Sequence, residues 1–154
     1  MNKFVLYLIL LCSPPAFANL SLPAVFGDHM VLQQHAEITL WGWGDPLEKV
    51  QVSSSWEDKV YESETDNYGK WKVILVTPQA GGPYSISIKG QNEITLSDVL
   101  IGEVWLCSGQ SNMAWSAASG ITDAAAEIAK ATVPELRFFC VEKRAAHTPL
   151  FDVA

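Results

Sequence analysis

Short segments in which apolar and polar residues alternate fill the chain from residue 19 to about residue 100. Alternation with a period of two is typical of β-strands that bury one face. It predicts strands over residues 37–43, 49–54, 59–64, 71–76, 84–89 and 93–96. Glycine, proline, asparagine and aspartate, which favour turns, are enriched in the segments between them. Short strands at this spacing predict a β-sandwich N-terminal domain over residues 19–100.

The pattern changes after residue 100. A continuous apolar run over residues 99–107 predicts a buried strand, an alanine-rich segment over 122–131 predicts a helix, and residues 136–141 predict another strand. Thr122 is able to cap the helix. Strand, helix and strand in this order begin an α/β sheet, which is stable only when both of its faces are covered. We therefore expect residues 101–154 to be the first βαβ portion of a truncated α/β domain.

The first 18 residues have the pattern of a signal peptide. Residues 1–3 are short and cationic, residues 4–11 are apolar, and a small-x-small cleavage motif ends at Ala18. The apolar run is shorter than the roughly 20 residues that span a bilayer. We expect export to the periplasm or beyond, cleavage after Ala18, and no membrane association of the mature chain.

The composition supplies ample material for a hydrophobic core, since 49% of the residues are apolar and six are tryptophan. The formal net charge of −7 argues against nucleic acid or an anionic membrane as a partner. The oligomeric state is not predicted. The tryptophans at positions 41, 43, 56 and 71 either stack on sugars or belong to the core, and the core interpretation is favoured.

Two cysteines, Cys107 and Cys140, remain after signal cleavage, and both lie in apolar runs. Buried thiols are the default interpretation of such positions. A disulfide between the two is compatible with an oxidising compartment, and the sequence leaves it open.

The apolar run up to Cys107 ends abruptly in Ser-Gly-Gln-Ser-Asn at residues 108–112. Such an ending predicts a tight turn that leads into a helix, with Gly109 providing a positive φ or a close backbone approach. Ser111 at this turn has two interpretations. It is either a nucleophile at the carboxyl end of a strand or a serine that only caps the helix.

Several motifs, in order, resemble one known family. They are IGEVWLCSGQSNM at residues 101–113, VFGDHMVLQQ at 25–34, WGWGDP at 41–46, GKW at 69–71 and AGGPY at 80–84. Together they resemble the N-terminal portion of sialate O-acetylesterase-like proteins, which are SGNH (GDSL-like) hydrolases. The resemblance covers nearly all of the chain after residue 18 and implies a flavodoxin-like α/β domain after the β-sandwich.

The resemblance implies an exported carbohydrate O-acetylesterase in which Ser111 attacks a sugar acetyl ester and forms an acetyl-enzyme. The backbone N–H of Ser111 would also donate to the oxyanion. Gln110 and Asn112 either contact the substrate or stabilise the turn. The substrate would be an O-acetylated sialic acid, with acetylated xylan or another acetylated glycan as the alternative. No metal or organic cofactor is implied.

The family's carboxy-terminal Asp-x-x-His block, which supplies acid and base, is absent from these 154 residues. None of the histidines, His29, His35 and His147, has an aspartate three positions earlier. We interpret His29 as a turn residue bonded to backbone, and His147 as a surface residue. Because serine without a general base is a poor nucleophile, we expect the chain alone to be inactive. The alternative function is a catalytically inactive product that acts at most as a glycan-binding β-sandwich.

Overall fold

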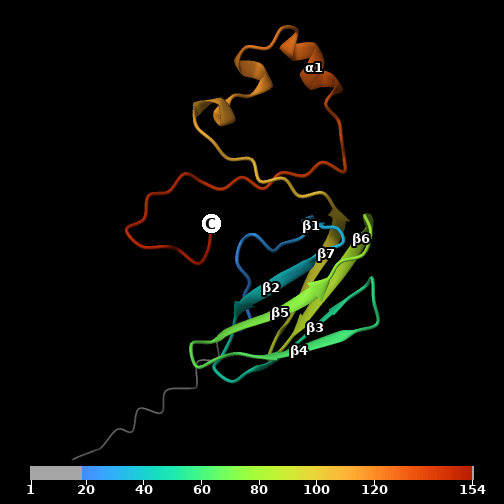
Figure 1. Cartoon of the computed structure of the whole chain (residues 1–154), viewed down its shortest axis with the longest axis vertical. Coiled ribbons are helices and arrows are strands. Elements are labelled where there is room, and N and C mark those ends of the chain that lie inside the picture. Colours follow the sequence, from blue (N-terminus) through green and yellow to red (C-terminus); the bar gives the residue numbers. More distant parts are fainter. Residues whose placement is uncertain (1–18, 154) are drawn as a thin grey trace, which may run out of the picture.

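A computed structural model describes residues 19–153, so the predicted signal peptide lies outside the described residues. Within these residues, seven strands come first and three short helices follow them (Figure 1). The strands are β1 (Val31–Gln33), β2 (Glu37–Trp43), β3 (Lys49–Ser54), β4 (Val60–Glu64), β5 (Lys70–Val76), β6 (Gly81–Lys89) and β7 (Glu93–Gly102). The helices are the 3₁₀-helices η1 (Ser111–Ala114) and η2 (Ala117–Ser119) and the α-helix α1 (Ala124–Lys130).

The strands form a five-stranded sheet in the order β1-β7-β6-β3-β4 and a two-stranded sheet of β2 and β5. Strand β1 pairs in parallel with β7, in a register that places Gln33 opposite Gly102. All the other strand pairs are antiparallel. The parallel pair brings residues near the N-terminus beside the end of β7, from which the chain continues toward Ser111.

Both sheets contribute to one hydrophobic core. In β5 the alternation is complete, because Trp71, Val73 and Leu75 are buried while the residues between them are exposed. Their partners in the core come from both sheets and from the segment before β1: Leu20, Leu32, Leu40, Val50, Val52, Ile86, Ile88, Leu96, Val99 and Ile101. Burying a large aliphatic or aromatic side chain contributes about 1.5–3 kcal/mol, so this cluster stabilises the strand-rich unit.

The strands predicted for residues 37–89 are confirmed within three residues of their bounds, the strand predicted over 93–96 continues to Gly102, and the fold is strand-rich as expected. The turn before β5 shows why aspartate and glycine predicted a turn between two strands. One carboxylate oxygen of Asp66 accepts the backbone N–H groups of Tyr68 (2.8 Å) and Lys70 (2.9 Å). Gly69 in this turn has φ +71°, which a glycine adopts without strain. Strand β7 extends past residue 100, where the sequence predicted the boundary between two domains.

The predicted strand over residues 99–107 is wrong in its second half. Residues 93–102 form the single strand β7, and the apolar residues that follow it are exposed. The pairing explains this end. Neighbouring β1 pairs with β7 only as far as Gly102, and β6 only as far as Ile101, so the backbone beyond has no strand to bond.

The segment after Gly102 also differs from the prediction. The predicted helix over 122–131 is present as the shorter α1, but its N-cap is Asp123, with φ 59° and no side-chain cap, so capping by Thr122 is wrong. Residues 136–141 form no strand. A strand needs a partner for its backbone groups, and in the described part of the chain none lies beside this segment.

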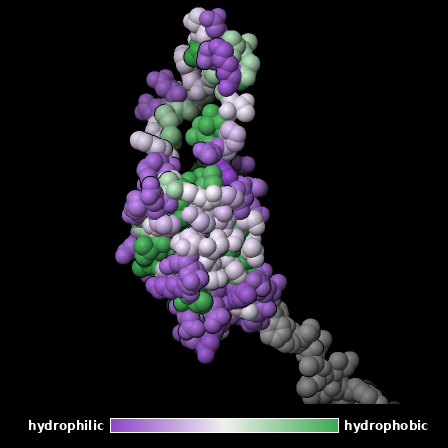
Figure 2. All heavy atoms as spheres, turned by 90° about the vertical axis from the view of Figure 1, so that its right-hand side faces the viewer, coloured by the Kyte–Doolittle hydropathy of each residue, from purple (hydrophilic) through white to green (hydrophobic). Residues whose placement is uncertain are grey.

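Few side chains between residues 103 and 153 are buried even in part, and hydrophobic groups lie at the surface in the narrow part of the molecule above the sheets (Figure 2). Trp105 and Leu106 are 83% and 95% exposed. Cys107 and Cys140 are exposed free thiols, so the prediction of buried thiols is wrong. Among residues 19–153, no helix is long and apolar enough to cross a membrane.

Candidate active site

Ser111 begins helix η1, in the segment that continues from the end of β7 (Figure 1). Gln110 precedes it in an extended conformation, with φ −95° and ψ −150°. The carbonyl of Gln110 accepts the backbone N–H of Met113 at 3.0 Å, and the carbonyl of Asn112 accepts that of Trp115 at 3.3 Å. These backbone bonds hold a tight turn with Ser111 at its tip, and all three predicted site residues are exposed there.

No side chain caps η1, so the interpretation of Ser111 as a capping serine is wrong. The φ of Gly109 is not positive, and the side chain of Met113 packs closely against this glycine instead. A Cβ built on Gly109 would lie 2.7 Å from Cγ of Met113, closer than two carbon atoms pack. The turn therefore fits a glycine at this position, and the Ser111 hydroxyl is not used for capping.

A serine nucleophile needs a base within hydrogen-bond reach. Within residues 19–153, no histidine or carboxylate is hydrogen-bonded to the hydroxyl of Ser111. His35 and His147 are exposed, which confirms the surface interpretation of His147. The described chain therefore contains the turn that presents the serine, without an assembled triad.

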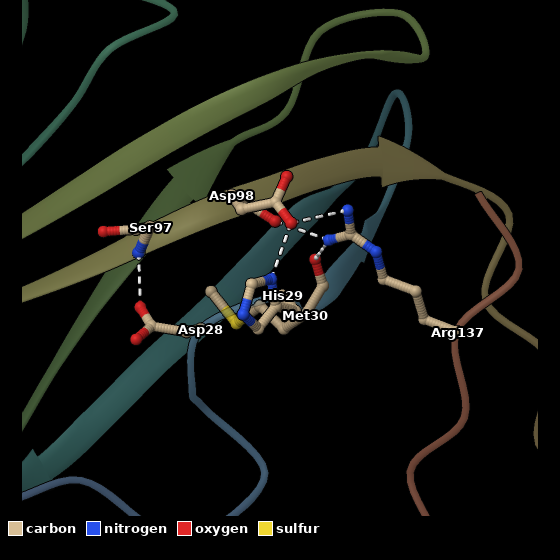
Figure 3. A network of polar contacts seen from close by, with 6 residues as sticks. All are labelled: Asp28, His29, Met30, Ser97, Asp98 and Arg137. Carbon is tan, nitrogen blue, oxygen red and sulfur yellow. Dashed lines mark hydrogen bonds and ion pairs between the residues drawn. The ribbon is translucent and has the colours of Figure 1, made fainter. Parts of the chain in front are cut away.

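His29 belongs to a polar network on the parallel strand pair, which Figure 3 shows from close by. Its Nδ1 lies 2.6 Å from Oδ2 of Asp98, and the same oxygen is 3.0 Å from Nη2 of Arg137. Nη1 of Arg137 donates to the backbone carbonyls of Asp98 and Met30. His29 is a turn residue, as expected, and its backbone N–H bonds to the carbonyl of Ser97, but its ring bonds to a carboxylate.

This network connects two distant parts of the chain. Arg137 comes from the segment after α1, and its side chain is only 19% exposed. It contacts a strand residue 39 positions earlier and a β1-flanking residue 107 positions earlier. The ring of His29 and the guanidinium of Arg137, in that order, lower the pKa of the Asp98 carboxyl below its ordinary value of 3.8. The carboxylate is therefore ionised at neutral pH and accepts hydrogen bonds from its two neighbours.

A second polar cluster holds the backbone where β7 ends and the nucleophile segment begins. The carboxylate of Glu103 accepts the amide of Gln34 at 2.7 Å and that of Gln33 at 3.1 Å. The amide oxygen of Gln33 in turn accepts the backbone N–H of Val104 at 2.9 Å. These amides, Gln34 first, lower the pKa of Glu103. The VFGDHMVLQQ and GEVWLCSGQSNM motifs are therefore in direct contact.

Sequence reasoning missed Asp98, Arg137 and the contact between Glu103 and the two glutamines. Asp98 and Arg137 carry no local signal, because neither lies in a motif that the sequence singled out. The order of the two motifs indicated a shared family without indicating that they touch. No three or more histidine, cysteine, aspartate or glutamate residues among positions 19–153 are grouped to hold a metal ion.

The tryptophans divide between two environments. Trp71 is 3% exposed and lies in the core, and Trp56 packs against the core at its edge, so the core interpretation is confirmed for both. Trp41 and Trp43 are half-buried and lie outside the core cluster, so the core interpretation is wrong for these two.

Known proteins resemble this chain in sequence and in fold. No protein-family model matches the chain. Sialate O-acetylesterase of Homo sapiens is 33% identical over 119 residues, covering 71% of this chain and 23% of the human protein. The Mus musculus protein of that name is 31% identical over 160 aligned positions, covering 97% of this chain and 29% of its own length. A crystal structure of a carbohydrate acetylesterase from Xanthomonas citri superposes with a TM-score of 0.81 at 35% identity, covering 88% of this chain and 31% of that chain.

Sequence and fold thus place the chain among relatives of carbohydrate acetylesterases. Within that class, it belongs to a sialate O-acetylesterase-like family, as the motifs predicted. The chain spans between 23% and 31% of the length of these relatives.

Proposed function

We propose that the chain forms the N-terminal portion of an exported carbohydrate O-acetylesterase whose nucleophile is Ser111. The observation that carries the proposal is the similarity to acetylesterases over most of this chain, together with Ser111 at the exposed tip of a glycine-containing turn. A β-sandwich formed by the strand-rich unit, followed by the start of an SGNH-type α/β domain, is the architecture that we propose.

The reaction would proceed by nucleophilic catalysis. The Oγ of Ser111 attacks the acetyl carbonyl and forms a new C–O bond while a general base takes its proton. The backbone N–H of Ser111 donates to the developing oxyanion. Collapse of the tetrahedral intermediate breaks the bond to the sugar oxygen, which leaves with the proton as an alcohol. Water then attacks the acetyl-enzyme, and acetate and free serine are released.

The apolar side chains exposed after Gly102 support a truncated α/β domain, because an α/β sheet buries such residues on both faces. In this proposal the histidine and its acidic partner come from residues beyond these 154. Gln110 and Asn112 flank the nucleophile and would contact the sugar. The relatives' names favour an acetylated sugar, and O-acetylated sialic acid and acetylated xylan are the substrates to compare.

Acetate release from a chromogenic acetyl ester tests the nucleophile. We expect no release above buffer from residues 19–154. For a longer protein that contains this chain, we expect Ser111→Ala to lower kcat by about 10⁴-fold or more, as removal of a triad serine does. Ser116→Ala is the matched control, because Ser116 is exposed in the same segment and its hydroxyl contacts only that of Ser119.

Retention of activity in the Ser111→Ala variant of the longer protein would refute the assignment of the nucleophile. Ser111-dependent activity of residues 19–154 alone would show that a base lies within the chain, with His147 as the first residue to substitute. Inactivity of the longer protein on every acetylated sugar would favour the catalytically inactive alternative.

A further inference from the structure

Strands β2 and β5 present an outer face that the proposed catalytic function does not use. Side chains alternate across the sheet, and Leu40 and Trp71 point into the core. Trp41 and Trp43 therefore face outward, and their cross-strand partners in the register are Lys72 and Lys70. Two half-buried tryptophans and two exposed lysines thus share the outer surface of this sheet.

The aromatic rings on this face form a connected row. The ring centroids of Trp41 and Trp43 lie 5.2 Å apart at 81°, and those of Phe26 and Trp41 lie 6.2 Å apart at 79°. These edge-to-face contacts fix the indole rings in place. A rigid aromatic surface binds a ligand at low cost in conformational entropy.

The two tryptophans and the two lysines line a cavity of about 630 Å³, which lies in the range of small-ligand sites. Phe151 belongs to its lining, and Nζ of Lys70 lies 3.9 Å above the centre of that ring. The polar part of the lining consists of Ser63, Glu64, Asp66, Lys70 and Lys72. The cavity therefore combines apolar ring faces with hydrogen-bonding groups.

The charges in the lining balance, because Glu64 and Asp66 offset the two lysines. The ammonium groups donate hydrogen bonds, and the carboxylates accept them. A pyranose ring matches both features, since its C–H faces are apolar and its hydroxyl groups both donate and accept. An acidic polymer fits less well, because two carboxylates line the cavity and the whole chain carries a net charge of −7.

We propose that this face is a binding site for a neutral oligosaccharide of pyranose units, separate from the site of Ser111. Because the indole planes of Trp41 and Trp43 lie at 81°, one ring stacks on a pyranose face while the other contacts the ligand through its edge, and Glu64 and Lys72 bond to the sugar hydroxyl groups. The proposed binding face lies on β2 and β5, whereas Ser111 lies in the segment that follows β7. In Figure 1, strand β2 ends and β5 begins at the lower left, whereas β7 ends at the upper right and leads into the Ser111 segment. The inference goes beyond the proposed esterase function and does not depend on it.

The test is binding of purified residues 19–154 to immobilised hexasaccharides. The neutral probes are β-1,4-linked glucose, xylose and mannose, and the acidic probe is α-1,4-linked galacturonic acid. We expect at least one neutral probe to bind, and Trp43→Ala and Trp41→Ala each to weaken that binding about tenfold or more, as loss of an aromatic anchor does. Trp105→Ala, which removes an exposed tryptophan outside this face, controls for nonspecific aromatic contact and leaves the affinity unchanged.

Circular dichroism would reveal misfolding of the tryptophan variants. A second variant tests the site in that case. Lys72→Met keeps the bulk of an exposed side chain and removes the ammonium group that would bond to the sugar. We expect it to weaken binding about twofold to tenfold. Absence of binding to every neutral probe, tighter binding of the acidic probe, or equal loss in Trp105→Ala would overturn the proposal. Because no ester is cleaved in this assay, its failure would leave the proposed esterase function untouched.

Discussion

Replacement of Leu75 by alanine tests where the stability of the chain resides. Leu75 is completely buried in β5, opposite Ile38 of β2. Truncating a buried leucine costs about 2–5 kcal/mol, because apolar burial is lost and a cavity remains. This is a large share of the roughly 5–15 kcal/mol that stabilises a domain.

The matched control is Leu106→Ala, the same chemical change at a position that is 95% exposed. Surface substitutions of this kind stay within about 0.5 kcal/mol. Equilibrium unfolding of residues 19–154 in urea, followed by tryptophan fluorescence, compares the two. With a loss of about 3 kcal/mol and an m value of about 1.5 kcal/mol/M, Leu75→Ala lowers the midpoint by about 2 M urea. Leu106→Ala shifts it by less than about 0.3 M urea.

A cost above about 1 kcal/mol for Leu106→Ala would refute this reasoning, because only a packed side chain loses that much on truncation. It would restore the predicted buried strand over residues 99–107. Hydrogen exchange gives an independent readout, with strong protection expected in β5 and little in residues 103–107, where no strand pairs with the backbone.

Two further predictions concern titration and thiol chemistry. Because the pKa of Asp98 is lowered in the folded state, its contribution to stability is complete above its ordinary pKa of 3.8 and is lost as the pH falls through the lower folded value. The urea midpoint of Asp98→Asn should therefore lie below that of the parent at pH 7 and converge with it in acid, and a constant difference would contradict the contact with His29 and Arg137. Cys107 and Cys140 should both react with a thiol reagent in the native state as fast as in urea, and slow labelling of either would show that it is buried.

Strand alternation was readable from the sequence because each strand buries one face against the shared core. Strand β5 shows this most fully, since every second residue from Trp71 to Leu75 is buried. Strand β1 was missed because its three residues hold too little alternation to detect. The end of β7 could not be read either. The apolar run continues past Gly102 without a break, and only the length of the pairing partners decides where the strand stops.

The polar contacts of Asp98 could not be predicted from the sequence, for a different reason. The bond between Arg137 and Asp98 joins residues 39 positions apart, and that between His29 and Asp98 joins residues 69 apart. Neither separation corresponds to a period of a helix or a strand. Ser111 is predicted from a local turn and from the family motif around it, whereas a histidine that would serve it cannot be found from local spacing.

The contact between Glu103 and the glutamines suggests why the strand-rich unit and the nucleophile segment share one chain. Gln33 and Gln34 lie where β1 ends, and the parallel pairing of β1 with β7 places them at the exit toward Ser111. Through Glu103 and Val104 they fix the direction in which the backbone leaves the sheet. Arg137 ties the returning segment to the same strand pair. The two ends of the segment that carries Ser111 are therefore anchored on one edge of the sheet, which gives the strand-rich unit a positioning role in the proposed esterase.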